Sequence, residues 1–156
     1  MLNNKQLGQA RKAALRLLKY RPRSEKELER RLRLKKIPAQ LVELVLGELK
    51  KTSLIDDARF AKIWTQDRLK KGYGPRRIEK ELNEKGLDRQ IIAGSIKNAR
   101  TFLNASPVLN ELLEKRLRRF KKQDDRLKTK QKLFNYLYRR GFELDHVRRY
   151  IDELAL

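Results

Sequence analysis

One pattern of apolar residues occurs three times along this chain of 156 residues. In each copy, six apolar residues stand at offsets 0, 4, 9, 14, 18 and 21. The three series are Leu28, Leu32, Ile37, Val42, Leu46 and Leu49; Ile78, Leu82, Leu87, Ile92, Ile96 and Ala99; and Leu133, Leu137, Phe142, Val147, Ile151 and Leu154. Only 39% of the chain is apolar, so chance would place polar residues at most of these positions. The pattern therefore predicts a structural unit that is repeated three times.

Each copy has the spacing of two helices joined by a tight turn. The apolar residues on either side of the turn recur with the helical period. The turn itself falls at Lys36, Gly86 or Gly141. A glycine there can take the left-handed conformation that ends many helices, and Lys36 breaks this pattern in the first copy.

A further helix precedes each pair, and the helix starts carry residues that cap or begin helices well. These are Ser24 with Glu27, Pro38, Asp56, Pro75, Asp88, Pro107 and Asp125. The expected helices cover residues 9–20, 24–36, 38–51, 57–71, 75–85, 88–99, 107–122, 126–140 and 143–154. The faces expected to be buried on the first helices comprise Ala10, Ala13, Ala14, Leu17 and Leu18; Phe60, Ala61, Ile63 and Trp64; and Leu109, Leu112, Leu113, Leu117 and Phe120.

These features predict an all-α fold class made of three tandem three-helix repeats at residues 1–52, 53–104 and 105–156. No segment alternates convincingly with the period of two that is typical of a strand. A unit of about 50 residues is small for independent stability. We therefore expect the repeats to pack in a row as an elongated, curved helical protein.

The net charge and the absence of cysteine restrict the classes of protein to which this chain can belong. Lysine and arginine number 41 against 20 acidic residues, which gives a net charge of +21 and a pI of about 10.5. The absence of cysteine excludes disulfide scaffolds, thiolate zinc sites and thiol catalysis. No run of consecutive apolar residues exceeds three, far short of a membrane span. We expect a soluble, cytoplasmic monomer whose partner is negatively charged.

Basic side chains gather in three places. One is an outward stripe at i, i+4 and i+7 on the second helix of the first repeat, with counterparts in the second repeat; the others are segment 115–122 and the turn around Tyr73. The candidate partner- or phosphate-binding residues are Lys26, Arg30, Arg33, Lys70, Lys71, Tyr73, Arg76, Lys80, Lys115, Arg118, Arg119, Lys121 and Lys122. For any single cation the alternative is a solvated helix face. Core packing is the default role of the aromatic residues that mostly accompany the apolar periodicity, namely Phe60, Trp64, Phe102, Phe120, Phe134, Tyr136, Phe142 and Tyr150.

Some basic residues have a structural interpretation instead. Lys35, Lys85 and Arg140 share one repeat offset near the end of a helix, where the macrodipole stabilises a cation by ~0.3–1 kcal/mol. Arg116 falls inside the apolar arc of its own helix. Its stem must therefore snorkel to solvent or fill a partner surface.

No arrangement of residues predicts catalysis. The pair Asp56-Asp57 invites a metal-dependent nuclease hypothesis, as does Asp124-Asp125, but adjacent side chains diverge and Asp56 is better explained as a helix cap. The single histidine, His146, has no candidate serine or cysteine partner, and no phosphate-binding loop occurs. We therefore expect a binding protein with no catalytic residue, no metal and no cofactor.

Several segments together resemble the bacterial RecX family. They are RPRSEKELERRL at 21–32, LIDDARFA at 54–61, RLKKGYGPRRIEKELNEKGL at 68–87 and FNYLYRRGF at 134–142, followed by Asp145 and Val147. Each segment alone is a modest helical signature, but their order and spacing cover nearly the whole chain. Lys36 and Ser53 stand where the family often has glycine, a departure that concerns the turns and not the fold.

The resemblance implies three three-helix repeats and a non-enzymatic regulator of DNA recombination and repair. Such proteins bind the RecA recombinase filament on single-stranded DNA, lie along its groove, and inhibit its ATP hydrolysis, extension and strand exchange. The alternative is a general nucleic-acid-binding protein with helix-turn-helix-like units. Only Arg89 and Gln90 at the start of a helix support base reading of that kind.

Overall fold

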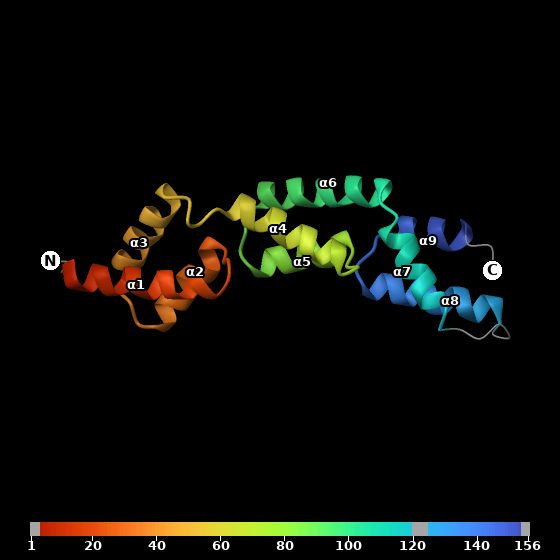
Figure 1. Ribbon diagram of the computed structural model, residues 1–156, viewed down its shortest axis with the longest axis horizontal. Helices are drawn as coiled ribbons and strands as arrows, with labels where there is room; N and C mark the ends of the chain where they lie inside the picture. The colour runs from red at the N-terminus through yellow and green to blue at the C-terminus, as the bar shows by residue number, and fades with distance from the viewer. Residues whose placement is uncertain (1–3, 120–124, 154–156) are drawn as a thin grey trace. The chain divides into compact units, whose positions relative to one another are not determined.

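The computed structural model describes residues 4–119 and 125–153, and within these ranges all regular secondary structure is helical. The helices are α1 (Asn4–Tyr20), α2 (Glu25–Leu34), α3 (Ala39–Lys51), α4 (Asp57–Lys70), α5 (Pro75–Glu84), α6 (Arg89–Ala105), α7 (Val108–Leu117), α8 (Arg126–Arg139) and α9 (Leu144–Glu153) (Figure 1). The predicted all-α class and its tandem three-helix repeats are therefore confirmed.

The predicted caps are present at the helix starts. Ser24 Oγ accepts a hydrogen bond from Glu27 N at 3.2 Å, while the Glu27 carboxylate pairs with Arg21 and Arg23. The side chains of Asp56, Asp88 and Asp125 each accept one amide hydrogen bond of 2.8–2.9 Å in the first turn of the following helix.

Three helix boundaries differ from the predicted ones by more than two residues. Helix α1 begins at Asn4 rather than at residue 9, because Leu7 still packs on the core. Helix α6 continues to Ala105 rather than 99, because Leu103 adds one more buried turn to its apolar face. Helix α7 ends at Leu117, short of the predicted 122. Like charges three or four residues apart in the basic run that follows oppose a longer helix.

The repeated apolar series forms the core. Every described member is buried except Ile37, which is half-buried; Leu154 lies outside the described residues. The prediction for Ile63 is wrong, because this side chain is 47% exposed. The buried arc of α4 passes instead through Phe60, Ala61, Thr65 and Leu69, and Ile63 falls outside it.

The chain divides into two compact units. The first comprises Met1–Lys62 with Leu82–Ile91, and the second comprises Ile63–Glu81 with Ile92–Leu156. In the first unit, α1, α2 and α3 enclose a core that extends to Ile55. In the second unit, α8 packs against α9.

Corresponding residues join successive repeats inside both units. In the first unit, Ser24 Oγ donates to the carbonyl of Lys85 at 2.6 Å. In the second unit, Gly74 N donates to the carbonyl of Arg140 at 2.8 Å. Ser24 and Gly74 share one repeat offset, and Lys85 and Arg140 share another. The sequence repeat therefore extends to the contacts between repeats. In each contact, the residue before the second helix of one repeat bonds to the turn that ends the second helix of the following repeat.

The turn at Lys36 keeps the geometry of its glycine counterparts. Its φ is +59°, against +73° at Gly86 and +87° at Gly141. An added Cβ at Gly86 would lie 2.6 Å from Cγ of Lys26, and one at Gly141 would lie 2.5 Å from the backbone nitrogen of Arg77. Lys36, by contrast, is exposed. Glycine is thus required where a neighbouring repeat approaches, which explains the departure at Lys36.

Candidate binding surfaces

The predicted stripe on α2 is an exposed face that is partly neutralised by one carboxylate. Lys26, Arg30 and Arg33 are exposed, opposite the buried leucines of the same helix. Glu29 lies between them, 3.2 Å from Lys26 Nζ and 2.8 Å from Arg33 Nη2. Arg30 forms no ion pair with any residue that the structure describes. Arg30 is therefore the cation of this stripe most available to an external anion.

The counterpart on α5 is also exposed but is tied to an aromatic ring. The Arg76 guanidinium lies 4.6 Å from the ring centre of Tyr138, and its Nη2 is 3.5 Å from the Tyr138 hydroxyl. Lys80 is exposed one turn further along α5. The structure thus links this part of the predicted surface to α8, a helix from which no candidate residue was selected.

Tyr73 is surrounded by arginines of its own chain. Its half-buried ring centre lies 4.0 Å from the guanidinium carbon of Arg77, 5.1 Å from that of Arg140 and 5.6 Å from that of Arg68. Arg77 is close to Tyr73 in the sequence, whereas the contacts with Arg68 and Arg140 were not predicted. Arg140 also donates to the carbonyls of Lys71 and Gly72 at 2.7 and 3.1 Å, so it contacts the end of α4 as well as ending α8. The only sequence feature that singled out Arg140 was its repeat offset, which it shares with Lys35 and Lys85.

The predicted lysines of this turn point into solvent. Lys70 and Lys71 are both exposed, and Lys71 Nζ pairs with Asp67 at 2.8 Å. The turn is therefore basic as predicted, and its ring is already in contact with cations of the same unit.

Glu81 anchors two of these arginines. It accepts from Trp64 Nε1 at 2.9 Å, from Arg68 Nε at 2.6 Å and from Arg77 Nε at 3.1 Å. Partial burial raises the pKa of Glu81, but these hydrogen bonds and the arginine charges outweigh it and hold the pKa below its ordinary value. This carboxylate thus connects α4 to α5 and orients the guanidiniums around Tyr73.

The basic segment after residue 114 is described only in part. Lys115 on α7 is exposed, as are Arg118 and Arg119 beyond its end, whereas Lys121 and Lys122 lie outside the described residues. Arg116 is half-buried, and its guanidinium carbon lies 5.0 Å from the ring centre of Tyr136. Arg116 therefore packs within its own unit.

The acidic pair at the start of α4 has structural contacts. Asp56 caps the helix, and Asp57 Oδ1 accepts from Glu25 N at 2.8 Å. Burial raises the pKa of Asp57, although this hydrogen bond opposes the rise. His146 Nδ1 lies 3.3 Å from Glu143 Oε2. Within residues 4–119 and 125–153 no group of three potential ligands is arranged to hold a metal ion, and no helix there is long and apolar enough to cross a bilayer.

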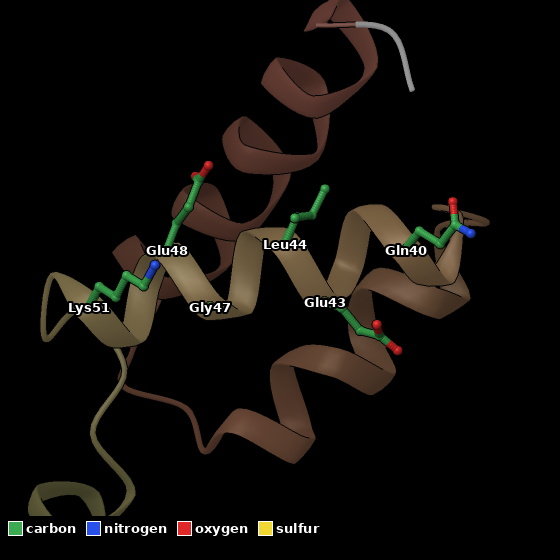
Figure 2. Close-up of a pocket in the computed structure, with 6 residues that line it drawn as sticks. All are labelled: Gln40, Glu43, Leu44, Gly47, Glu48 and Lys51. Atoms are coloured by element: carbon green, nitrogen blue, oxygen red, sulfur yellow. The ribbon is translucent and has the colours of Figure 1, made fainter. Parts of the chain in front are cut away.

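A pocket on the outer face of α3 was missed by sequence analysis. Figure 2 shows the side chains of Gln40, Glu43, Leu44, Glu48 and Lys51 projecting from this helix around the bare backbone of Gly47. A Cβ at Gly47 would meet nothing within 4 Å, and Glu48 pairs with Arg11 at 2.8 Å. A glycine inside an apolar helical pattern was the only signal of this pocket.

The fold and these surfaces define a class: a tandem three-helix-repeat protein that presents cations on its outer helix faces. The three-helix domains of RecX match this chain in order, the first at residues 10–49, the second at 56–94 and the third at 108–151. The chain belongs to the RecX family of regulatory proteins.

Individual relatives agree with this assignment. The chain is 33% identical over 142 residues to "Regulatory protein RecX" of Pseudomonas entomophila, covering 91% of this chain and 89% of that protein. It is 29% identical over 146 residues to "Regulatory protein RecX" of Finegoldia magna, covering 93% and 71%. The crystal structure of RecX from Lactobacillus salivarius superposes with a TM-score of 0.79 at 22% identity, over 97% of this chain and all of that chain. This last likeness supports the fold.

Proposed function

We propose that this protein binds the RecA filament on single-stranded DNA and inhibits its ATP hydrolysis, extension and strand exchange without catalysing a reaction itself. Membership of the RecX family is the observation that carries the proposal. The net charge of +21 supports it, because a filament groove that holds DNA has a negative field.

The proposed contact residues are the exposed cations on successive repeats together with Tyr73. They are Lys26, Arg30, Arg33, Lys70, Lys71, Tyr73, Arg76, Lys80, Lys115, Arg118 and Arg119, with Lys121 and Lys122 in the part of the chain that is not described. Cations on several repeats would contact neighbouring recombinase subunits or DNA phosphates. Holding neighbouring subunits together would restrain the movements that extension and hydrolysis require.

The first experiment compares two ligands across a salt series. Labelled protein is titrated with bare single-stranded DNA and with the same DNA coated by recombinase and a slowly hydrolysed ATP analogue. We expect clear preference for the coated filament at near-physiological salt. Equal or tighter binding to bare DNA, with a steep salt slope, would contradict the filament proposal. Preference for a defined duplex site would support the helix-turn-helix alternative instead.

A charge reversal tests the contact surface. Arg30→Glu is the sharpest single change, because Lys26 and Arg33 also hold Glu29 and their replacement would disturb α2 itself. Inhibition should weaken while helicity is retained. Lys97→Glu is the matched control, since Lys97 is an exposed cation on α6 outside the proposed surface. Equal effects of the two changes would indicate that net charge alone, and not this surface, determines inhibition.

A further inference from the structure

Four side chains form a line along α8 that borders its buried side. Their spacing of i, i+4, i+7 and i+11 places them on one helix face. The α8 stripe consists of Leu127, Gln131, Phe134 and Tyr138. Leu127 is 77% exposed, Tyr138 is 41% exposed and Phe134 is half-buried, whereas Leu133 and Leu137 on the neighbouring side are fully buried. The stripe is therefore a largely apolar edge of α8 that the core of the protein covers only in part.

The two aromatic rings of the α8 stripe are held in a fixed, parallel arrangement. The rings of Phe134 and Tyr138 are stacked with centres 6.3 Å apart and planes 7° from parallel. The Arg76 guanidinium lies 4.6 Å from the centre of the Tyr138 ring and within 3.5 Å of its hydroxyl. Two flat apolar surfaces and one planar cation are thus already oriented before any ligand arrives.

The charged side chains within α8 are all positive, and the carboxylate of Asp125 caps its first turn. Helix α8, with the sequence RLKTKQKLFNYLYR, contains five cations and no carboxylate. These cations are Arg126, Lys128, Lys130, Lys132 and Arg139. By helical spacing, Lys130 lies on one side of the stripe, and Lys128, Lys132 and Arg139 lie on the other. A ligand for this face must therefore combine negative charge with flat apolar surfaces.

We propose that the α8 stripe is a stacking surface for the bases of a single-stranded nucleic acid, with the backbone phosphates beside the flanking cations. Bases of a single strand present their faces to aromatic rings and arginine planes, whereas a duplex conceals them. An acidic peptide would satisfy the charge but would leave the oriented rings without flat partners. The inference rests on the proposed function only for the cellular source of the strand.

The test uses the full-length chain, a labelled short oligothymidine and no recombinase. Phe134→Leu combined with Tyr138→Leu keeps apolar bulk and all cations but removes both rings. Affinity should fall roughly tenfold or more. The dependence of affinity on salt should not change, because the phosphate contacts remain. Tyr20→Leu is the matched control, since Tyr20 on α1 is 81% exposed and belongs to the other unit. Equal loss in the control, or no loss in the double variant, would overturn the proposal.

A second measurement needs no variant and so does not depend on how the double variant folds. The unaltered chain should bind oligothymidine more tightly than an abasic strand of equal length, and more tightly than a duplex. Equal binding of the abasic strand would show that phosphates alone are recognised. Tighter binding of polyglutamate than of oligothymidine would show a protein-docking face, and either result overturns the proposal. Because recombinase is absent, failure here leaves the filament experiment to decide the proposed function separately.

Discussion

At the scale of single residues, the turns after the second helices show where a side chain is forbidden. Gly141 and Gly86 both have positive φ, but their neighbours differ. A Cβ at residue 141 would lie 2.5 Å from the backbone nitrogen of Arg77, whereas one at residue 86 would lie 2.6 Å from Cγ and 2.7 Å from Cβ of Lys26. We predict that Gly86→Ala lowers the free energy of unfolding by about 1–2 kcal/mol for the left-handed backbone, and by a further amount because Lys26 must shift. Gly141→Ala should cost about 3 kcal/mol or more.

Urea denaturation of the two glycine variants measures this difference. Each variant should retain the helical content of the unaltered chain in the absence of urea. Equal costs would show that the neighbouring repeat does not constrain the turn at Gly141 as closely as the 2.5 Å approach indicates.

At the turn of Lys36 we expect a substitution to change the free energy of unfolding in the opposite direction. A lysine at φ +59° pays about 1–2 kcal/mol that a glycine would not. Glycine in turn makes the unfolded chain more flexible, which costs roughly 0.4–1 kcal/mol. Lys36→Gly should therefore leave stability unchanged or raise it by up to about 1.5 kcal/mol, as measured by the urea midpoint. A clear loss of stability would mean that the Lys36 side chain makes a stabilising contact that outweighs its strain.

At the scale of elements, Ser24 both caps α2 and joins it to the following repeat. It is fully buried, accepts from Glu27 N and donates to the Lys85 carbonyl. Ser24→Ala removes the cap, worth about 1 kcal/mol, and the hydrogen bond to the carbonyl, worth about another. Asp125→Ala is the control, because Asp125 is an exposed cap on α8. Thermal unfolding should show a larger loss for Ser24→Ala, and equal losses would argue against the joining role.

Glu81 joins α4 to α5, and its contribution depends on pH. Because the hydrogen bonds from Arg68, Arg77 and Trp64 hold its pKa below the ordinary 4.5, the folded state releases this proton more readily than the unfolded state does. The stabilisation is therefore complete above pH 4.5 and is lost as the pH falls through the lowered pKa. Glu81→Gln should cost about 2 kcal/mol at neutral pH.

The difference between the chain and its Glu81→Gln variant should shrink as the solution is acidified. The single tryptophan, Trp64, reports the transition directly, since its indole nitrogen is one of the donors to Glu81. Urea denaturation followed by fluorescence from about pH 7 to about pH 3 measures this convergence. A difference that stays constant over this range would contradict the lowered pKa.

At the scale of the whole molecule, the repeat was predictable from sequence because burial depends on offsets along a helix. Leu28, Ile78 and Leu133 are each fully buried at the same repeat position. Contacts between distant side chains were not predictable in this way. The ring of Tyr73 is flanked by Arg140, a neighbour brought close only by the packing of two repeats. The α8 stripe was likewise missed, because Phe134 was assigned to the core from the apolar periodicity and no role was predicted for Tyr138.

Net charge makes ionic strength act in opposite directions on folding and on binding. The chain has 41 cations against 20 anions. Because exposed ion pairs stabilise a fold by only about 0–1 kcal/mol each, we expect repulsion among the excess cations to outweigh the attraction within these pairs. Raising salt from about 0.01 M to about 0.15 M shortens the screening length from about 30 Å to about 8 Å. The melting temperature should therefore rise by several degrees.

Over the same salt range, binding to the coated filament and to bare single strands should weaken. Each phosphate contacted on a single strand lowers log K by roughly 0.7 per tenfold increase in salt. Differential scanning calorimetry and a binding titration on the same samples measure both trends. If the melting temperature fell together with affinity, attractive pairs such as Arg11 with Glu48 would dominate the fold. The excess of cations would then be balanced inside the molecule instead of being held for a partner.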